Sequence, residues 1–326
     1  MKLLRAEPIS TLEALVKQAQ YAIRVTTGIR ANFVKNYLNT PDGREGWASY
    51  FLKHGYTIYL TDPPQRGRSP WIPGEGTVEA VPVSYVQKYF TTSEVFAPTE
   101  WPQASLHTQW PGTGLVGDPI FDAFYASQVQ LQTSAFISDD NTKPAYNALL
   151  DKIGNAILVT HSQSGPYGWV AGDARPELVK GIIAVEPEGP PFVNETGPTG
   201  PPRLDGVTRL PLHYDPPVTD IVTDLKTVTI PPPEGKHYTS CTIQAEPARK
   251  LVNLSNVPVV LITGEASYHA PYDYCTIKFF EQTGVPITWI DLPSERLRGN
   301  GHFLFMERNN LEIAGLVLSW LEKTIK

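Results

Sequence analysis

Two serines follow an apolar run in the segment NAILVTHSQSGPYGW, residues 155–169. A serine hydroxyl is a weak nucleophile, so nucleophilic catalysis also requires a base that takes its proton and donors that hold the oxyanion. An exposed nucleophile sits on a sharp turn between a strand and a helix, and small residues stand two positions before and two positions after it. Around Ser162 these positions hold Thr160 and Ser164, and this turn directly follows the apolar run. We therefore predict that Ser162, rather than Ser164, is the nucleophile.

The base and its acidic partner must come later in the chain, in the order serine, acid, histidine. His302 lies in the Gly-rich segment GNGHFLFMERNN, between the last expected strand and the last expected helix, and we predict that it is the base. His269, which follows another expected strand, is the rival base. Glu186, Glu188 and Glu265 all satisfy the chain order as the acid, so spacing alone leaves that choice open.

An oxyanion hole normally needs two preorganised N–H donors, and the loss of one costs roughly 3 kcal/mol. The backbone N–H of Gln163, directly after the predicted nucleophile, is the first candidate. The second donor should come from the loop after the expected strand 21–26, which offers Gly28 and Ile29. Glycine favours a close backbone approach, but two of the four residues at 28–31 have bulky side chains. We therefore expect a weakened oxyanion hole.

Short β-branched runs alternate with helical patterns, which is typical of a parallel sheet with crossover helices. We expect strands at 56–61, 156–160, 181–186, 258–263 and 287–291, all apolar on both faces as in buried parallel sheets, and a sixth strand with a weaker pattern at 21–26. We expect helices at 44–55, 144–154, 272–284 and 309–323.

Two long stretches interrupt this alternation, residues 63–135 (the first insertion) and 187–250 (the second insertion). Both are rich in proline, and the first is also rich in aromatic residues. Loops of this length are uncommon in a compact domain unless they are functional. We predict one domain over residues 1–326, with both insertions forming a cap or lid. Four aromatic residues of the first insertion are candidates for lining an apolar substrate pocket: Trp101, Trp110, Phe124 and Tyr125.

The composition excludes several classes of partner. The chain has 326 residues, a formal net charge of −6 and a pI of about 5.7, with no basic stripe that could neutralise nucleic-acid phosphates. No apolar run reaches the length of a membrane span. No motif for a metal, a nucleotide or another cofactor stands out, since the glycines of WPGTGLVGD do not join a strand to a helix. We expect a small apolar substrate and no cofactor.

Residues 1–20 carry charges throughout and lack the apolar core of a signal peptide, so the sequence as written predicts a cytoplasmic protein. Cys241 and Cys275 are the two cysteines. They are compatible with free thiols in the cytosol or with a disulfide in a secreted protein, and the sequence leaves both alternatives open.

The chain resembles the esterase 713-like family of the α/β-hydrolase superfamily, over most of residues 36–326. The resemblance lies in the segments NTPDGREGWASYFLKHGYTIYLTDPPQRGRSPW, WPQASLHTQWPG, HSQSG, VEPEGPPF, TGEASYHAPYD and GNGHFLFMERNN. It implies an α/β-hydrolase fold and a triad in which Ser162 is the nucleophile, Glu186 the acid and His302 the base. It also implies a homodimer that hydrolyses carboxylic esters of bulky or cyclic apolar compounds.

The resemblance ends near the N terminus. Family members carry a His-Gly-Gly type loop where this chain reads YAIRVTTGIRANFVKNYL, and the strands expected before that loop are absent. We expect an incomplete N terminus, which would also remove a signal peptide from a secreted protein. Two other functions share the same residues: a tailoring enzyme in which an internal nucleophile closes a ring, and an inactive homologue that only binds. The product mass separates hydrolysis from cyclisation, and a serine-reactive phosphonate identifies an inactive homologue.

Overall fold

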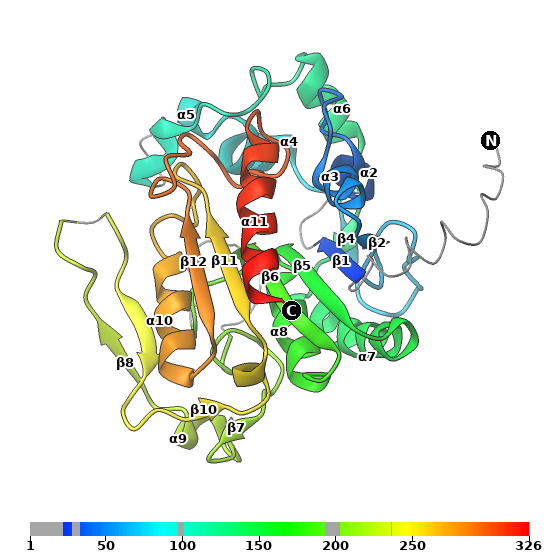
Figure 1. The fold of residues 1–326 in the computed structure, drawn as a ribbon. Coiled ribbons are helices and arrows are strands. Elements are labelled where there is room, and N and C mark those ends of the chain that lie inside the picture. The colour runs from blue at the N-terminus through cyan, green and yellow to red at the C-terminus, as the bar shows by residue number, and fades with distance from the viewer. Residues whose placement is uncertain (1–21, 28–32, 97–100, 193–202, 236, 326) are drawn as a thin grey trace.

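The core of the protein is a six-stranded parallel sheet in the order β12-β11-β6-β5-β1-β2 (Figure 1). The computed structural model describes residues 22–27, 33–96, 101–192, 203–235 and 237–325. The strands are β1 (Ala22–Thr27), β2 (Thr57–Thr61), β5 (Ala156–Ser162), β6 (Val179–Pro187), β11 (Val259–Thr263) and β12 (Ile287–Asp291). Each coincides with a strand expected from the sequence, and the chain has the predicted α/β architecture.

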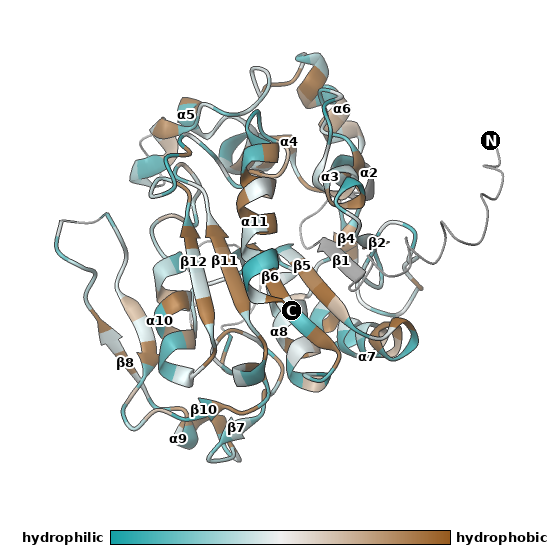
Figure 2. Ribbon diagram, viewed as in Figure 1, coloured by the Kyte–Doolittle hydropathy of each residue, from teal (hydrophilic) through white to brown (hydrophobic). Residues whose placement is uncertain are grey.

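Burial differs between the centre and the edge of the sheet. Every residue of β5 and β11 is buried, and β6 is buried except at Lys180. At the edges, β2 has no fully buried residue and β12 has only Ile290. The expectation of burial on both faces is therefore wrong for β2 and β12. Figure 2 shows the apolar colouring concentrated in β5, β6 and β11.

Helices flank the sheet. The main ones are α2 (Phe33–Leu38), α3 (Trp47–Lys53), α7 (Ala135–Ile153), α8 (Gly165–Ala174), α10 (Asp273–Thr283) and α11 (Asn310–Thr324). The helix expected at 144–154 begins at Ala135 instead and contains Pro144. Ser134 caps this longer helix by accepting a hydrogen bond from the N–H of Ile137, at 3.3 Å. None of the helices in the described ranges combines the length and the apolar character of a membrane span.

The first insertion lies beyond the carboxyl ends of β11 and β12, where Figure 1 places α4 and α5. Its elements are β3 (Val78–Glu79), α4 (Val83–Val86), the π-helix η1 (Gln87–Thr91), α5 (Ser93–Phe96), the 3₁₀-helix η2 (Pro102–Leu106), α6 (Pro119–Ala126) and β4 (Leu131–Gln132). Its aromatic side chains share a hydrophobic core with Phe303 and Phe305, which follow His302. The insertion is therefore packed against the loop that carries the predicted base.

The second insertion runs along α10 and toward the amino ends of the strands (Figure 1). Its elements are β7 (Tyr214–Asp215), α9 (Ile221–Asp224), β8 (Thr227–Ile230), β9 (Cys241–Gln244) and β10 (Lys250–Leu251), with the 3₁₀-helix η3 (Leu254–Asn256) following. A disulfide joins Cys241 of β9 to Cys275 of α10. Of the two alternatives for the cysteines, the structure contains the bridge.

Candidate active site

The turn after β5 has the geometry of a nucleophile elbow. Ser162 ends the strand with a φ of +55°, and α8 begins three residues later. Positive φ is uncommon for a residue with a side chain and is concentrated at functional sites. A Cβ atom on Gly165 would lie 2.5 Å from the Cβ of Pro187, so only glycine permits this close approach of α8 to the end of β6.

The two serines of the turn have different surroundings. The Ser164 hydroxyl is fully buried, donates to the carbonyl of His161 at 2.8 Å and accepts from the N–H of the same residue at 2.8 Å. Ser164 therefore closes the turn internally. Ser162 has 4% of its surface exposed, and its side chain interacts with that of Tyr268, which belongs to the loop after β11.

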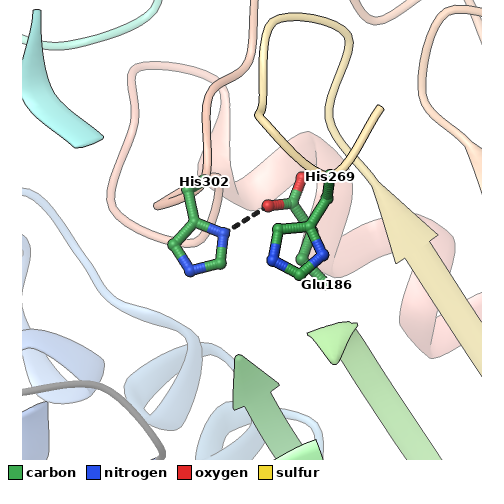
Figure 3. Close-up of side chains that lie close together, drawn as sticks. All are labelled: Glu186, His269 and His302. Atoms are coloured by element: carbon green, nitrogen blue, oxygen red, sulfur yellow. Dashed lines mark hydrogen bonds and ion pairs between the residues drawn. The ribbon is translucent and has the colours of Figure 1, made fainter. Parts of the chain in front are cut away.

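The predicted base, His302, packs against this elbow through His161. The ring of His302 stands 4.4 Å from the ring of His161, and the backbone carbonyl of His302 lies 2.9 Å from Nε2 of His161. Nδ1 of His302 is 2.5 Å from Oε2 of Glu186, and both side chains are completely buried (Figure 3). One imidazole nitrogen therefore faces a carboxylate, which leaves Nε2 for a proton transfer.

Glu186 is held from several sides. It ends β6 with a φ of +41°, which is a second positive φ at a predicted site residue. Its Oε1 accepts from the N–H of Gly264 at 2.7 Å, and its Oε2 accepts from the Ser267 hydroxyl at 2.6 Å. A Cβ atom on Gly264 would lie 2.7 Å from the carbonyl oxygen of Asn300, so this backbone contact also requires glycine. The carboxylate therefore has a fixed orientation.

Burial dominates the electrostatics of this pair. It raises the pKa of Glu186 to about 8, against the hydrogen bonds from Ser267 and Gly264, which lower that pKa. Burial also holds the pKa of His302 well below its ordinary value, and the neighbouring His161 and His269 lower it further. A low pKa favours the neutral imidazole, and the neutral form is the one that can accept a proton.

The other two candidate acids lie elsewhere. The side chain of Glu188 pairs with two buried arginines, Arg203 at 3.0 Å and Arg209. Glu265 pairs with Arg298 and accepts from the N–H of Gly299 at 2.8 Å. Of the three candidates, only Glu186 is hydrogen-bonded to His302.

The rival base His269 belongs to a separate buried pair. Its Nδ1 lies 3.0 Å from Oδ1 of Asp273, and its ring stacks on that of His302 at 4.8 Å. Possible ligand atoms of Glu186, His269 and His302 lie within 4.8 Å of one another (Figure 3). The 2.5 Å separation between Glu186 and His302 is a hydrogen-bond distance, shorter than two ligands about 2 Å from one zinc ion would normally keep. The geometry thus fits a hydrogen-bonded cluster.

Sequence reasoning missed a buried network that supports the His302 loop. His107, in the first insertion, lies between two carboxylates, Glu94 at 3.0 Å and Glu307 at 2.7 Å. Glu307 in turn accepts hydrogen bonds from the backbone N–H of Gly301 and from the side chain of Asn300. The glycine-rich loop is therefore held in place by the first insertion, although its sequence suggests flexibility.

The residues predicted for the oxyanion hole are only partly within the described structure. Gln163 follows Ser162 in the elbow, and its side-chain oxygen accepts a hydrogen bond from Arg66 at 3.0 Å. Gly28 and Ile29 lie outside the described residues. The second donor therefore stays a prediction.

The four aromatic residues predicted to line a substrate pocket are largely engaged in packing. The indole N–H of Trp101 donates to the carbonyl of Ala266 at 2.9 Å, and its ring lies 6.0 Å from that of Tyr268. Trp110 and Phe124 contact each other edge to face, and the Tyr125 hydroxyl donates to a backbone carbonyl. Trp101 alone of the four has a ring contact with Tyr268, and a role in substrate binding stays a prediction for all of them.

Comparison with known proteins supports a family and a fold. No family model matches the chain. The chain is 53% identical over 288 residues to the "Probable secreted lipase phiG" of Fungal sp. (strain ATCC 74256), which covers 88% of this chain and 78% of that protein. The structure described as "The Atomic Resolution Structure of a Novel Bacterial Esterase" is similar with a TM-score of 0.58 and 19% identity, over 94% of this chain and 82% of that chain. The α/β-hydrolase fold predicted from the sequence is confirmed.

Proposed function

Because the chain belongs to the esterase and lipase family of α/β-hydrolases that includes the probable secreted lipase of the fungal strain, it is a carboxylic ester hydrolase, and we propose that Ser162, His302 and Glu186 are its catalytic triad. The observation that carries this proposal is the contact between His302 Nδ1 and Glu186 Oε2, at 2.5 Å, next to the elbow that contains Ser162. A carboxylate in that place fixes the imidazole tautomer and stabilises the imidazolium that forms during the reaction.

In the first step, Ser162 Oγ attacks the ester carbonyl carbon and its proton passes to Nε2 of His302. The tetrahedral intermediate then collapses, the bond to the alcohol oxygen breaks, and His302 returns the proton to that oxygen. Water attacks the resulting acyl-serine by the same route, which releases the acid and restores the Ser162 hydroxyl. Glu186 keeps its hydrogen bond to Nδ1 of His302 and so holds the imidazole in one orientation throughout.

The backbone N–H of Gln163 would donate to the oxyanion, with the second donor supplied by Gly28 or Ile29. The bulky side chains of Ile29 and Arg30 predict weaker oxyanion stabilisation than a glycine-rich loop provides. The substrate we propose is an ester of an apolar or cyclic small molecule. Trp101, which stands beside Tyr268, is the best placed of the predicted aromatic residues to contact it.

We also propose that the protein is secreted, contrary to the cytoplasmic location predicted from residues 1–20. The disulfide between Cys241 and Cys275 supports this proposal, because such bonds persist mainly in oxidising compartments. The name of the fungal relative points the same way. A homodimer is a further proposal, taken from the family resemblance, and sedimentation of the purified protein tests it.

A serine-reactive phosphonate tests the triad. Wild-type protein should become labelled at Ser162, and Ser162→Ala should abolish labelling and lower kcat by about 10⁴-fold or more. Ser164→Ala is the matched control, since it removes the neighbouring hydroxyl, which is hydrogen-bonded to the N–H and the carbonyl of His161, and it should still be labelled. Labelling that survives Ser162→Ala and disappears in Ser164→Ala would overturn the assignment.

A further inference from the structure

The hydroxyl of Tyr268 lies close to the proposed base and interacts with the proposed nucleophile. It lies 3.3 Å from Nε2 of His302, the nitrogen opposite the one that contacts Glu186. The same side chain interacts with the side chain of Ser162. Tyr268 was not among the residues predicted from the sequence, although it lies in the segment TGEASYHAPYD that carries part of the family resemblance.

The backbone around Tyr268 is anchored on both sides of the site. The N–H of Ala266 donates to the carbonyl of Asn300 at 2.8 Å, in the His302 loop. The Ser267 hydroxyl donates to Glu186 at 2.6 Å. The residues directly before Tyr268 are thus tied to the base loop and to the acid, so its backbone position follows theirs.

The ring of Tyr268 is confined as well. It has edge contacts with Tyr89 and Trp101, at centroid distances of 5.8 and 6.0 Å, and lies 6.3 Å from Phe90. Only 9% of the residue is exposed. A rotation that removed the hydroxyl from the site would have to displace these neighbours. The phenol oxygen therefore stays near Ser162 and His302 when a substrate binds.

This position has a chemical consequence for ester cleavage. Nε2 of His302 takes the proton of Ser162 and later gives it to the alcohol oxygen that leaves, so that oxygen must come within hydrogen-bond distance of Nε2. An oxygen bound between Nε2 and the former Ser162 hydroxyl also lies within reach of the phenol. The phenol hydroxyl, which interacts with Ser162 in the free protein, can then donate a hydrogen bond to the leaving oxygen.

Resting on the proposed triad, we propose that Tyr268 is a catalytic residue whose hydroxyl donates a hydrogen bond to the leaving-group oxygen during acylation. The bond between the carbonyl carbon and the alcohol oxygen breaks, and its electron pair goes to that oxygen. The oxygen receives its proton from Nε2 of His302, while Tyr268 keeps its own proton throughout. Burial raises the pKa of the Tyr268 phenol well above its ordinary value, which keeps it in the donor form at all working pH values.

A series of substituted phenyl acetates tests this role, because the acyl group stays constant while the basicity of the leaving oxygen changes. A hydrogen-bond donor accelerates the departure of a basic leaving group most. It has little effect on 4-nitrophenolate, whose negative charge is already delocalised over the ring and the nitro group. Tyr268→Phe should lower kcat/KM for phenyl acetate about tenfold and for 4-nitrophenyl acetate less than about twofold. The dependence of kcat/KM on leaving-group pKa should therefore become steeper. If Tyr268 had only a structural role, the substitution would lower kcat/KM by the same factor for every ester.

Tyr37→Phe is the matched control. Tyr37 is also fully buried, and its hydroxyl has no hydrogen-bond partner within the described residues, so this variant should keep the wild-type slope. Replacing Tyr268 with 3,5-difluorotyrosine keeps the ring and gives a stronger donor, so it should make the slope shallower. This second variant supplies the test even if Tyr268→Phe does not fold.

The donor role would be overturned if Tyr268→Phe lowered kcat/KM by the same factor for every ester and the fluorinated protein kept the wild-type dependence on leaving-group pKa. That result would leave the triad intact. A rise of kcat/KM for every ester would also overturn it, since it would mean that the phenol only obstructs the site. Failure of the wild-type protein to react with a phosphonate at Ser162 would instead remove the proposed triad on which this inference rests.

Discussion

The buried charge network around His107 makes the stability of the protein depend on pH in a specific way. Burial lowers the pKa of His107, but its hydrogen bonds and charge interactions with Glu307 and Glu94 outweigh that effect and raise the pKa to about 9, from 6.5 in the unfolded chain. Only 3% of the residue is exposed, so solvent screens these interactions little. At neutral pH the folded protein therefore contains an imidazolium between two carboxylates.

The size of this contribution to stability follows from the rise in the pKa of His107. Each pKa unit corresponds to 1.36 kcal/mol, so a rise to about 9 is worth about 3 kcal/mol of folding free energy. Because the pKa is raised in the folded state, this contribution is fully present below pH 6.5 and is lost as the pH rises toward 9. His107→Gln removes the charge and should remove this part of the pH dependence.

Urea unfolding of both proteins at several values between pH 6 and pH 9.5 measures the effect. The free energy of unfolding of the wild type should fall by about 3 kcal/mol more than that of His107→Gln over this range. Buried carboxyls with raised pKa values, such as Glu186 at about 8 and Asp205 at about 7, titrate in both proteins and cancel in the difference. If the free energy of unfolding depended on pH in the same way in the wild type and in His107→Gln, the reasoning would be refuted.

Two further predictions concern the acid and the disulfide. Glu186→Gln should lower kcat by several orders of magnitude because it removes the partner of His302, whereas Glu265→Gln, which loses only a contact to Arg298 and Gly299, should stay near wild type in an ester hydrolysis assay. Equal activity of Glu186→Gln and wild type would contradict the assignment. Cys241→Ser should lower the free energy of unfolding by roughly 4 kcal/mol, since the bridge spans a sequence separation of 34 residues, and a reducing agent should destabilise the wild type but not this variant. Denaturant unfolding with and without reductant measures both effects, and a wild type insensitive to reductant would refute the prediction.

The sequence alone was sufficient to predict the sheet. Its central strands are short β-branched apolar runs between turns, and this pattern specifies a strand that is covered on both sides. The same pattern overestimated the burial of β2 and β12, because position within a sheet depends on strand order, which a local run does not encode. It also placed the start of α7 at the wrong residue, since Pro144 resembles a helix start and only the cap at Ser134 marks the true one.

For the candidate site, the sequence determined residue types and order along the chain. The turn of small residues after β5 singled out Ser162, and the loop before the last helix singled out His302. The choice among three glutamates depended on where the ends of β6 and β11 lie relative to that loop. Spacing carries no information on that point. In the structure Glu186 is the one of the three that lies within 2.5 Å of His302, and its role as the catalytic acid stays a prediction.

Tertiary structure alone decided which other groups join this pair. Tyr268 and His302 are 34 residues apart in the chain, and His107 and Glu307 are 200 apart. Each contact exists because two loops that no local pattern connects are packed against each other, through the cores that they share. Residue type and order follow from the sequence by short-range rules, whereas the partner of a buried polar group is determined by the packing of the whole chain.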